Sequence, residues 1–357
     1  MTTASKKSPF LSVRNHCTHL TGDLHYTQSE QFLFKGNIFL LVRVSEPFPA
    51  DVTLVFGGAH SLDKAEALRD CNVDALMVSF EYIRRSPAKF HETIGPIYDE
   101  WPVRRYLDSG VSTLIRLAFE KKAPKEILHK KSVELFRDYY NYLKRYGHHW
   151  DHVAEIDVDN FINPETAAKF RTKLNDVAPK TQLIPIWHEI RGELGWQQMC
   201  DEFPYVGIGS DITFGNAAMF SFYRHLVDHA HSMNRVVHMF GSTKEDALDI
   251  SQCDTSDSVT WLSSQRFARY PGGAFIPHGS ASSSAQTKDM ARAIRFLHEV
   301  EERFGHLGVT ADDLLAGKVG KHSQHVVSIS LMLDRQEELR ARRRSQEARK
   351  SSNPIQS

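Results

Sequence analysis

Short apolar runs follow one another along the chain from residue 52 onward, and each is separated from the next by a longer amphipathic or polar segment. Several runs are apolar almost throughout instead of alternating, which is typical of parallel strands buried on both faces. Strands that alternate with helices indicate repeated βα units. The predicted strands are residues 52–57, 75–80, 105–109, 153–158, 182–187, 205–209, 235–240 and 257–261.

Eight parallel strands are the number that closes a (β/α)8 barrel, and a chain of 357 residues leaves room for one such barrel with additions at its ends. Segments 130–146, 164–177 and 216–232 have the composition of the intervening helices. We therefore expect an α/β fold, a (β/α)8 TIM barrel with a small N-terminal extension and a helical C-terminal tail. The alternative is a doubly wound or irregular sheet with fewer strands.

We expect residues 1–50 to form the extension, a strand-rich cap over the lower end of the barrel. Residues 51–306 would form the barrel, with its last helix at 288–304, and residues 307–357 the tail. Segment 335–350 mixes seven basic with three acidic residues, which predicts a solvated helix or a frayed tail. Contact with phosphates is the alternative for that segment.

Charge and cysteine content exclude several classes of protein. Lys plus Arg number 44, as do Asp plus Glu, so no overall positive field draws the chain to a polyanion. The cysteines are far apart, which argues against a disulfide framework and a cysteine-rich zinc site. We find no apolar leader and no run long enough to span a bilayer. The expected location is the cytoplasm.

Carboxylates stand at the ends of three predicted strands. Asp108 ends the third strand, Asp157 lies in the fourth, and Asp257 opens the eighth. Working residues of a barrel lie at the C-terminal ends of its strands, so these side chains are expected to share one mouth. Such a set suits chemistry at an anomeric carbon, where one carboxylate attacks and another transfers a proton. Each aspartate alone also fits a helix cap or a turn.

These residues also carry a resemblance to a known family. The sequence Asp-Ser-Gly at 108–110, Asp157, the Gly-Ile-Gly loop at 207–209, Met239 with residues 242–246 after it, and Asp-Ser-Val at 257–259 resemble tRNA-guanine transglycosylases in order and approximate spacing. The resemblance covers roughly residues 100–270. The chain looks most like the DpdA-type proteins of phages and bacteria, which insert 7-deazaguanine bases into DNA. If a phage encodes it, the expected location is the host cytoplasm.

The resemblance implies a reaction. Asp257 would be the nucleophile that attacks C1′ of the target nucleotide, expels guanine and holds the sugar as a covalent intermediate. Asp108, with Ser109 beside it, would act as general acid and base. The expected partners are DNA, with tRNA as the alternative, and a 7-deazaguanine base such as preQ0. An accessory protein for strand opening is possible, and neither a cofactor nor a metal is expected.

The resemblance also implies how the base is recognised. Asp157 would accept hydrogen bonds from the base, Gly207 and Ile208 would offer backbone groups to its edge, and Met239 would pack on its face. His188 stands close to where the family usually has a glutamine; it would either recognise the base or serve as a packing residue.

The sequence departs from the family at several points. No cysteine follows Cys253, so the family's zinc motif is missing, and DNA is favoured over tRNA for that reason and because no C-terminal RNA-binding module is recognisable. The Asp-Ser-Gly motif continues as Val111-Ser112 without the usual second glycine. Asp159 lies close in sequence to Asp157, and Asp254 to Asp257, so an alternative assignment gives the two roles to Asp159 and Asp254.

Phosphate contacts must come from local basic groups. Arg266 and Arg269 follow Asp257 closely and would grip phosphates beside the reacting sugar, since a flipped nucleotide needs its flanking phosphates held. A lysine cluster at 121–131 would contact nucleic acid or be an ordinary solvated surface. Two other functions stay open: hydrolysis of an N-glycosidic bond by the same carboxylates, and nucleic-acid binding without catalysis.

Overall fold

A computed structural model describes residues 12–13, 29–34, 37–42, 52–159, 161–209, 217–242, 244–262, 286–316 and 318–352. Its central sheet is parallel throughout, in the order β8-β7-β6-β5-β4-β12-β11-β10-β9. The strands are β4 (Thr53–Gly57), β5 (Ala75–Ser79), β6 (Arg104–Asp108), β7 (His152–Ala154), β8 (Leu183–Ile184), β9 (Ile186–Trp187), β10 (Tyr205–Ile208), β11 (Val236–Met239) and β12 (Thr255–Ser258).

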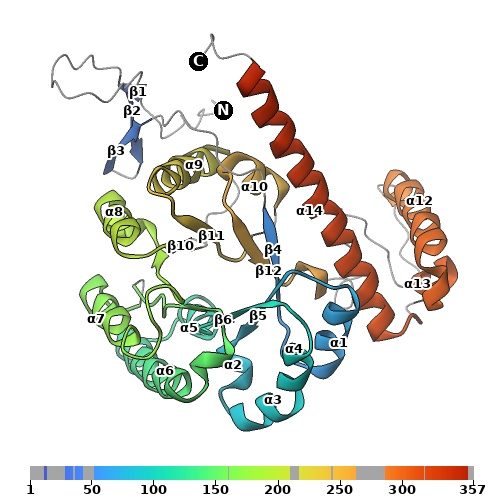
Figure 1. The fold of residues 1–357 in the computed structure, drawn as a ribbon, viewed down its shortest axis with the longest axis horizontal. Helices are drawn as coiled ribbons and strands as arrows, with labels where there is room; N and C mark the ends of the chain where they lie inside the picture. Colours follow the sequence, from blue (N-terminus) through green and yellow to red (C-terminus); the bar gives the residue numbers. More distant parts are fainter. Residues whose placement is uncertain are drawn as a thin grey trace, which may run out of the picture.

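The two ends of this sheet are halves of one strand. Pro185 is the single residue between β8 and β9, and because proline has no N–H to donate, it interrupts the ladder there. β8 pairs with β7, and β9 pairs with β10. The carbonyl of Pro185 still accepts a hydrogen bond from Gly207 N at 2.8 Å. A strand is present in each of the eight predicted places, and together they form the expected TIM-like barrel (Figure 1). Two bounds were predicted wrongly: β7 ends at Ala154 instead of at residue 158, and β12 runs from residue 255 to 258, with residues 260–262 in a 3-10 turn.

The barrel interior is filled by side chains that alternate along the strands with those facing the helices. Its apolar residues form a cluster separate from the main core, namely Val55, Ala75, Met77, Tyr106, Ile184 and Tyr205, with Phe240 packed against them. The other strand residues join the main core under the outer helices, Leu107, Val206 and Met239 among them. Burial on both faces explains why the strands are apolar without strict alternation.

Helices surround the strands (Figure 1). They are α1 (Leu62–Asp70), α2 (Phe80–Ile83), α3 (Pro87–Thr93), α4 (Gly95–Asp99), α5 (Ser112–Phe119), α6 (Lys125–Tyr146), α7 (Pro164–Leu174), α8 (Gly192–Glu202), α9 (Ala217–Ser232) and α10 (Glu245–Ser251). Short 3-10 turns are η1 (Gly147–His149), η2 (Glu189–Arg191) and η3 (Thr260–Leu262). α7 shows a clear sequence signal, because Asn163 caps it by accepting from Thr166 N at 2.8 Å and Pro164 stands at its first position.

The C-terminal helix is where the sequence expectation is wrong. Residues 335–350 are helical, as predicted, but they belong to α14 (Lys321–Ser352), which packs on α1, β4 and η3 instead of being solvated. Gln336, Leu339 and Arg343 are almost fully buried. Gln336 Oε1 accepts from Leu54 N at 2.6 Å. Arg343 donates to the carbonyls of Cys253 at 2.9 Å and Leu248 at 2.7 Å.

α14 therefore takes the place expected for the helix at 288–304. That helix is α12 (Gln286–Phe304), and it lies outside α14 together with α13 (Ala311–Leu315) and the turn η4 (Gly305–Leu307) (Figure 1). A small second core holds it there, formed by Leu297, Val300, Phe304, Val309, Leu314, Val319 and Val327. The last of these belongs to α14. The strand-rich extension is also present: β1 (Ser12–Val13), β2 (Ser29–Phe34) and β3 (Asn37–Val42) form an antiparallel sheet.

Replacing Arg343 with methionine is expected to destabilise the protein by about 2–4 kcal/mol. The change removes the Arg343 donor from the buried carbonyl of Cys253 and leaves the carbonyl of Leu248 with the Gln252 N–H alone, and an unsatisfied buried acceptor costs free energy. Chemical denaturation would measure the loss. The matched control is Arg344→Met, because Arg344 is the next residue of α14 and is exposed. Equal stabilities of the two variants would contradict the anchoring role of Arg343.

Candidate active site

The three predicted carboxylates lie at the same end of the barrel. Asp108 is the last residue of β6, Asp157 follows β7 by three residues, and Asp257 lies near the end of β12. β6 and β7 are neighbours, and β5 and β4 stand between β6 and β12. Asp157 and Asp257 both act electrostatically on Asp108. The side chains of Asp157 and Asp257 keep 18% and 14% of their surface exposed, so both reach the mouth.

Asp108 has the character of a general acid. Burial raises the pKa of Asp108 to about 7, and the negative charges of Asp157 and Asp257 add to the rise, against the opposing effect of Ser79 and of the Gly110 N–H. That N–H lies 3.2 Å from Asp108 Oδ2. Gly110 takes a positive φ of 83°, which a glycine accepts without strain. A carboxyl group near half protonation at neutral pH can both give and take a proton.

Asp257 is held through one of its two oxygens. Its Oδ1 accepts from Gly241 N at 2.8 Å and lies 3.2 Å from His238 Nε2. Within the described part of the chain, Oδ2 has no hydrogen bond. Two donors on one oxygen fix the carboxylate plane and leave the other oxygen available to an incoming electrophile. This is the geometry that a carboxylate nucleophile needs.

His238 connects Asp257 to a chain of hydrogen bonds inside the barrel. The His238 side chain is fully buried, and its Nδ1 lies 2.7 Å from Thr255 Oγ1. Thr255 Oγ1 bonds the Tyr205 hydroxyl, and Tyr205 Oη lies 3.2 Å from Tyr106 Oη. One proton arrangement satisfies every member: each hydroxyl donates toward His238, and neutral His238 donates from Nε2 to Asp257. This assignment follows from the network.

Sequence reasoning missed His238 because its neighbour Met239 carried the motif. Strand alternation supplies the missing signal, since His238 on β11 and Asp257 on the adjacent β12 both face the interior of the barrel. Met239 is fully buried in the core under the helices, whereas Phe240 faces the interior. Met239 is therefore not among the residues that line the mouth.

Asp157 is paired with His188, so the structure brings these two predicted residues together. His188 Nε2 lies 3.3 Å from Asp157 Oδ2, and the His188 side chain is 6% exposed. The ring lies over Gly209, where an added Cβ would come within 2.2 Å of His188 Cε1. Glycine at 209 is thus required by the histidine ring.

The space beside Gly207 is likewise occupied by a side chain of the protein. An added Cβ at Gly207 would meet the Phe240 ring at 2.5 Å. Gly207 N donates to Pro185, and the carbonyl of Ile208 accepts from Phe240 N at 3.0 Å. These groups serve the barrel ladder, and the Ile208 side chain is fully buried. Ser109 is also fully buried beside Asp108.

The two alternative aspartates have structural partners instead. Asp159 is buried and pairs with Arg191 at 2.7 Å, while Arg191 also contacts Glu155 at 2.6 Å. Asp254 accepts from Val237 N at 2.7 Å and lies 3.0 Å from His231 Nε2. Asp157 and Asp257, and not these neighbours, therefore face the mouth.

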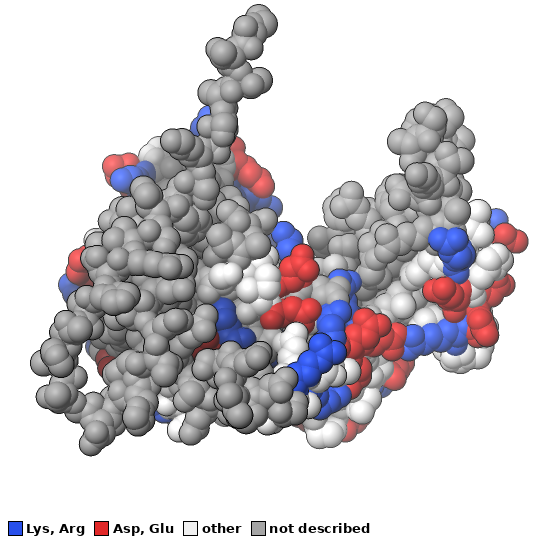
Figure 2. Space-filling model, turned by 90° about the horizontal axis from the view of Figure 1, so that it is seen from above, with Lys and Arg blue, Asp and Glu red and all other residues white. Residues whose placement is uncertain are grey.

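The predicted phosphate contacts Arg266 and Arg269 lie outside the described residues, as do residues 210–216 that follow β10. The lysines of the cluster are exposed, Lys121, Lys122 and Lys131 among them, and Lys131 pairs with Glu134 at 2.6 Å. Figure 2 shows basic and acidic side chains beside one another on the face in view.

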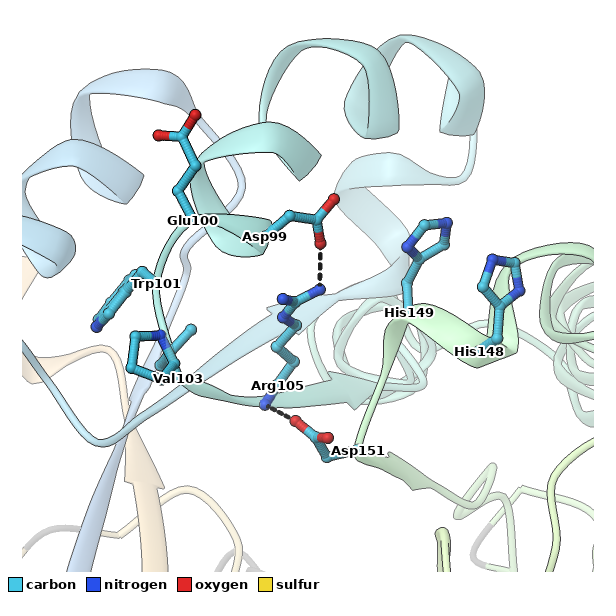
Figure 3. A pocket seen from close by; sticks show the side chains of 9 residues that line it. Asp99, Glu100, Trp101, Val103, Arg105, His148, His149 and Asp151 are labelled. Atoms are coloured by element: carbon cyan, nitrogen blue, oxygen red, sulfur yellow. Dashed lines mark hydrogen bonds and ion pairs between the residues drawn. The ribbon is translucent and has the colours of Figure 1, made fainter.

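A cavity of about 470 Å³ opens at the opposite end of the barrel (Figure 3). Arg105 at the start of β6 lies in it, bonded by its side chain to Asp99 and by its N–H to Asp151. His148 and His149 form one side. The N-terminal end of barrel strands serves stability, so we place the candidate site at the carboxylate mouth.

Neither a metal cluster nor a membrane span is found in the described residues. Within them, no group of three or more His, Cys, Asp or Glu side chains is arranged to hold a metal ion. None of the helices in that part of the chain combines the length and apolarity needed to cross a bilayer. No model of a known protein family matches the chain, and no curated protein matches it either.

Proposed function

We propose that the protein is a transglycosylase that exchanges guanine in DNA for a 7-deazaguanine base such as preQ0. The observation that carries the proposal is that two carboxyl groups with different surroundings, Asp108 and Asp257, lie at one mouth of the barrel. Burial raises the pKa of Asp108 to about 7, while Asp257 is held by two donors on one oxygen. Groups that differ in this way divide into acid and nucleophile.

In the first half of the reaction, Asp257 Oδ2 attacks C1′ of the target nucleotide. The bond from C1′ to the guanine nitrogen breaks, its electron pair goes to guanine, and protonated Asp108 gives a proton to the leaving base. The product is an ester between Asp257 and the sugar. Gly241 and His238 stabilise the charge on Oδ1 before the attack and keep the carboxylate oriented.

The second half reverses these roles. The incoming 7-deazaguanine loses its ring N–H proton to ionised Asp108, and the same nitrogen attacks C1′. Asp257 leaves with the electron pair of the ester bond. No proton or electron is gained or lost over the cycle, so no cofactor is required. Asp157 would accept hydrogen bonds from the N–H groups of the base, with His188 setting the direction of its carboxylate.

An exchange assay tests the proposal. The protein is incubated with labelled guanine or preQ0 base and with duplex DNA, single-stranded DNA or tRNA, and the label retained in each polymer is counted. We expect label in DNA. Label that enters tRNA alone would overturn the choice of DNA, and release of free guanine without incorporation would indicate a hydrolase.

His238→Gln is expected to slow exchange about 10- to 100-fold with little change in DNA affinity. The amide shortens the side chain and breaks the link between Asp257 and Thr255, so the nucleophile loses one donor. Single-turnover kinetics and a binding titration separate the two effects. His152→Gln is the matched control, because His152 packs on Tyr106 and Tyr205 in the same interior layer. An equal effect in both variants would mean that His238 only fills space.

A further inference from the structure

A pair of stacked rings lies on loops of the barrel's C-terminal end. His60 follows β4, and Tyr82 lies in α2 directly after β5. Their ring centroids are 3.9 Å apart, and the rings are inclined by 12°. Tyr82 is nevertheless 61% exposed. One face of its ring therefore rests on His60, and much of the remaining side chain is open to solvent.

The position of this pair relative to the carboxylates follows from the strand order. β5 and β4 fill the arc of the barrel between β6, which carries Asp108, and β12, which carries Asp257. Ser79 at the end of β5 is in register with Asp108. An added Cβ at Gly110 would come within 2.8 Å of Glu81 N, so the loop after Asp108 touches α2. The stacked pair thus stands on the rim between the two catalytic candidates.

The short helix α2 is built to hold Tyr82 outward. Phe80 and Ile83 of the same turn are buried at 2% and 3% exposure. Arg84 fixes the end of the turn through Asp138, at 2.7 Å. Because the turn is rigid, it loses little conformational entropy when a ligand stacks on the Tyr82 ring, and this favours binding.

One basic group lies beside the rings, and a second is close in sequence. Lys64 Nζ lies 3.4 Å from His60 Nε2, on the side of the pair that belongs to α1. Arg85 is exposed three residues after Tyr82. An open aromatic face with cations beside it matches a nucleotide, whose base stacks while its phosphate meets the positive charge.

We propose that Tyr82, supported by His60, is a stacking site for an unpaired base next to the nucleotide under exchange. The inference rests on the proposed function and names its substrate more closely, as a stretch of DNA locally unstacked around the target. Extracting the target base removes a stacking partner from its neighbour. The Tyr82 ring supplies a replacement at the rim, and any base can use it because every base has an aromatic face.

A fluorescent base analogue tests this site directly. The full-length protein is titrated into single-stranded DNA that carries 2-aminopurine beside one guanine, and quenching and affinity are recorded. We expect Tyr82→Ala to weaken binding about tenfold and to abolish the quenching, while Tyr82→Phe retains both. The matched control is Phe119→Ala. Phe119 is 57% exposed at the last position of α5, and its removal should change neither reading.

The outcomes separate this inference from the proposed function. Affinity and quenching unchanged in Tyr82→Ala would overturn the stacking site, whatever the exchange assay shows. The same holds if the wild-type protein neither binds nor quenches the probe. Tyr82-dependent quenching without base exchange would support the stacking site and reject the transglycosylase. Melting temperatures of the variants confirm that the exposed substitutions leave the fold intact.

Discussion

Asp257→Asn should lower the rate of base exchange by roughly four orders of magnitude, since loss of a covalent nucleophile has effects of this size. An amide oxygen is a far weaker nucleophile and leaving group than a carboxylate. In the wild-type carboxylate, Gly241 N and His238 Nε2 both donate to Oδ1, and Oδ2 is left for the attack. The amide has a single oxygen, so when that oxygen accepts these two bonds, none is left for the attack. Exchange is measured as label entering DNA.

The control for this variant is Asp246→Asn. Asp246 is exposed on α10, close in sequence to Gly241, and loses its charge in the same way. The control should keep wild-type exchange, and DNA binding by Asp257→Asn should stay within a few-fold of wild type. If Asp257→Asn retained more than a tenth of the rate, the covalent step would have to be abandoned.

Asp108→Asn should lower exchange by about 10² to 10⁴, the range expected for loss of a general acid and base. It should also change the pH profile. Burial raises the pKa of Asp108 to about 7, so the wild-type group is protonated below that pH and can protonate the departing guanine. The wild-type rate is therefore expected to fall above pH 7, and the residual rate of the variant should not show this fall.

The same carboxyl group predicts how stability depends on pH. Its folded pKa of about 7 lies above the ordinary value of 3.8, so folding favours the protonated form. The contribution to stability is complete below pH 3.8 and is lost as the pH rises toward 7. Between pH 4 and 7 Asp108→Asn should gain stability relative to wild type, by up to a few kcal/mol. A constant difference across this range, measured by denaturation, would show that folding does not raise the pKa of Asp108.

The sequence was sufficient to predict the barrel because its strands are buried on two faces. That burial imposes apolar runs, which are visible in any single sequence. α14 was misjudged because its buried side chains include Gln336 and Arg343. They occur with Leu339 at helical spacing, yet their polarity matches that of a solvated tail. Only the backbone groups they meet, Leu54 N and the carbonyls of Cys253 and Leu248, explain their burial.

The sequence predicted the carboxylates of the candidate site but not the residues around them. Strand ends located Asp108, Asp157 and Asp257, since a parallel barrel gathers these ends at one mouth. The glycines were less informative, because a missing Cβ makes room without telling what fills it. At Gly207 and Gly209 the room is taken by Phe240 and His188. The motif also led to Met239 and not to His238, although β11 places His238, and not Met239, on the inward face that Asp257 shares.

Locating the sugar on the protein would test the covalent mechanism without relying on any variant. The protein is mixed with DNA in the absence of a replacement base, denatured, and digested with nuclease and protease, and the modified peptide is sequenced by mass spectrometry. The covalent mechanism predicts one adduct, an ester of a deoxyribose fragment with the carboxylate of Asp257, which disappears when preQ0 base is added before denaturation. An adduct on another residue, or none while exchange proceeds, would contradict it.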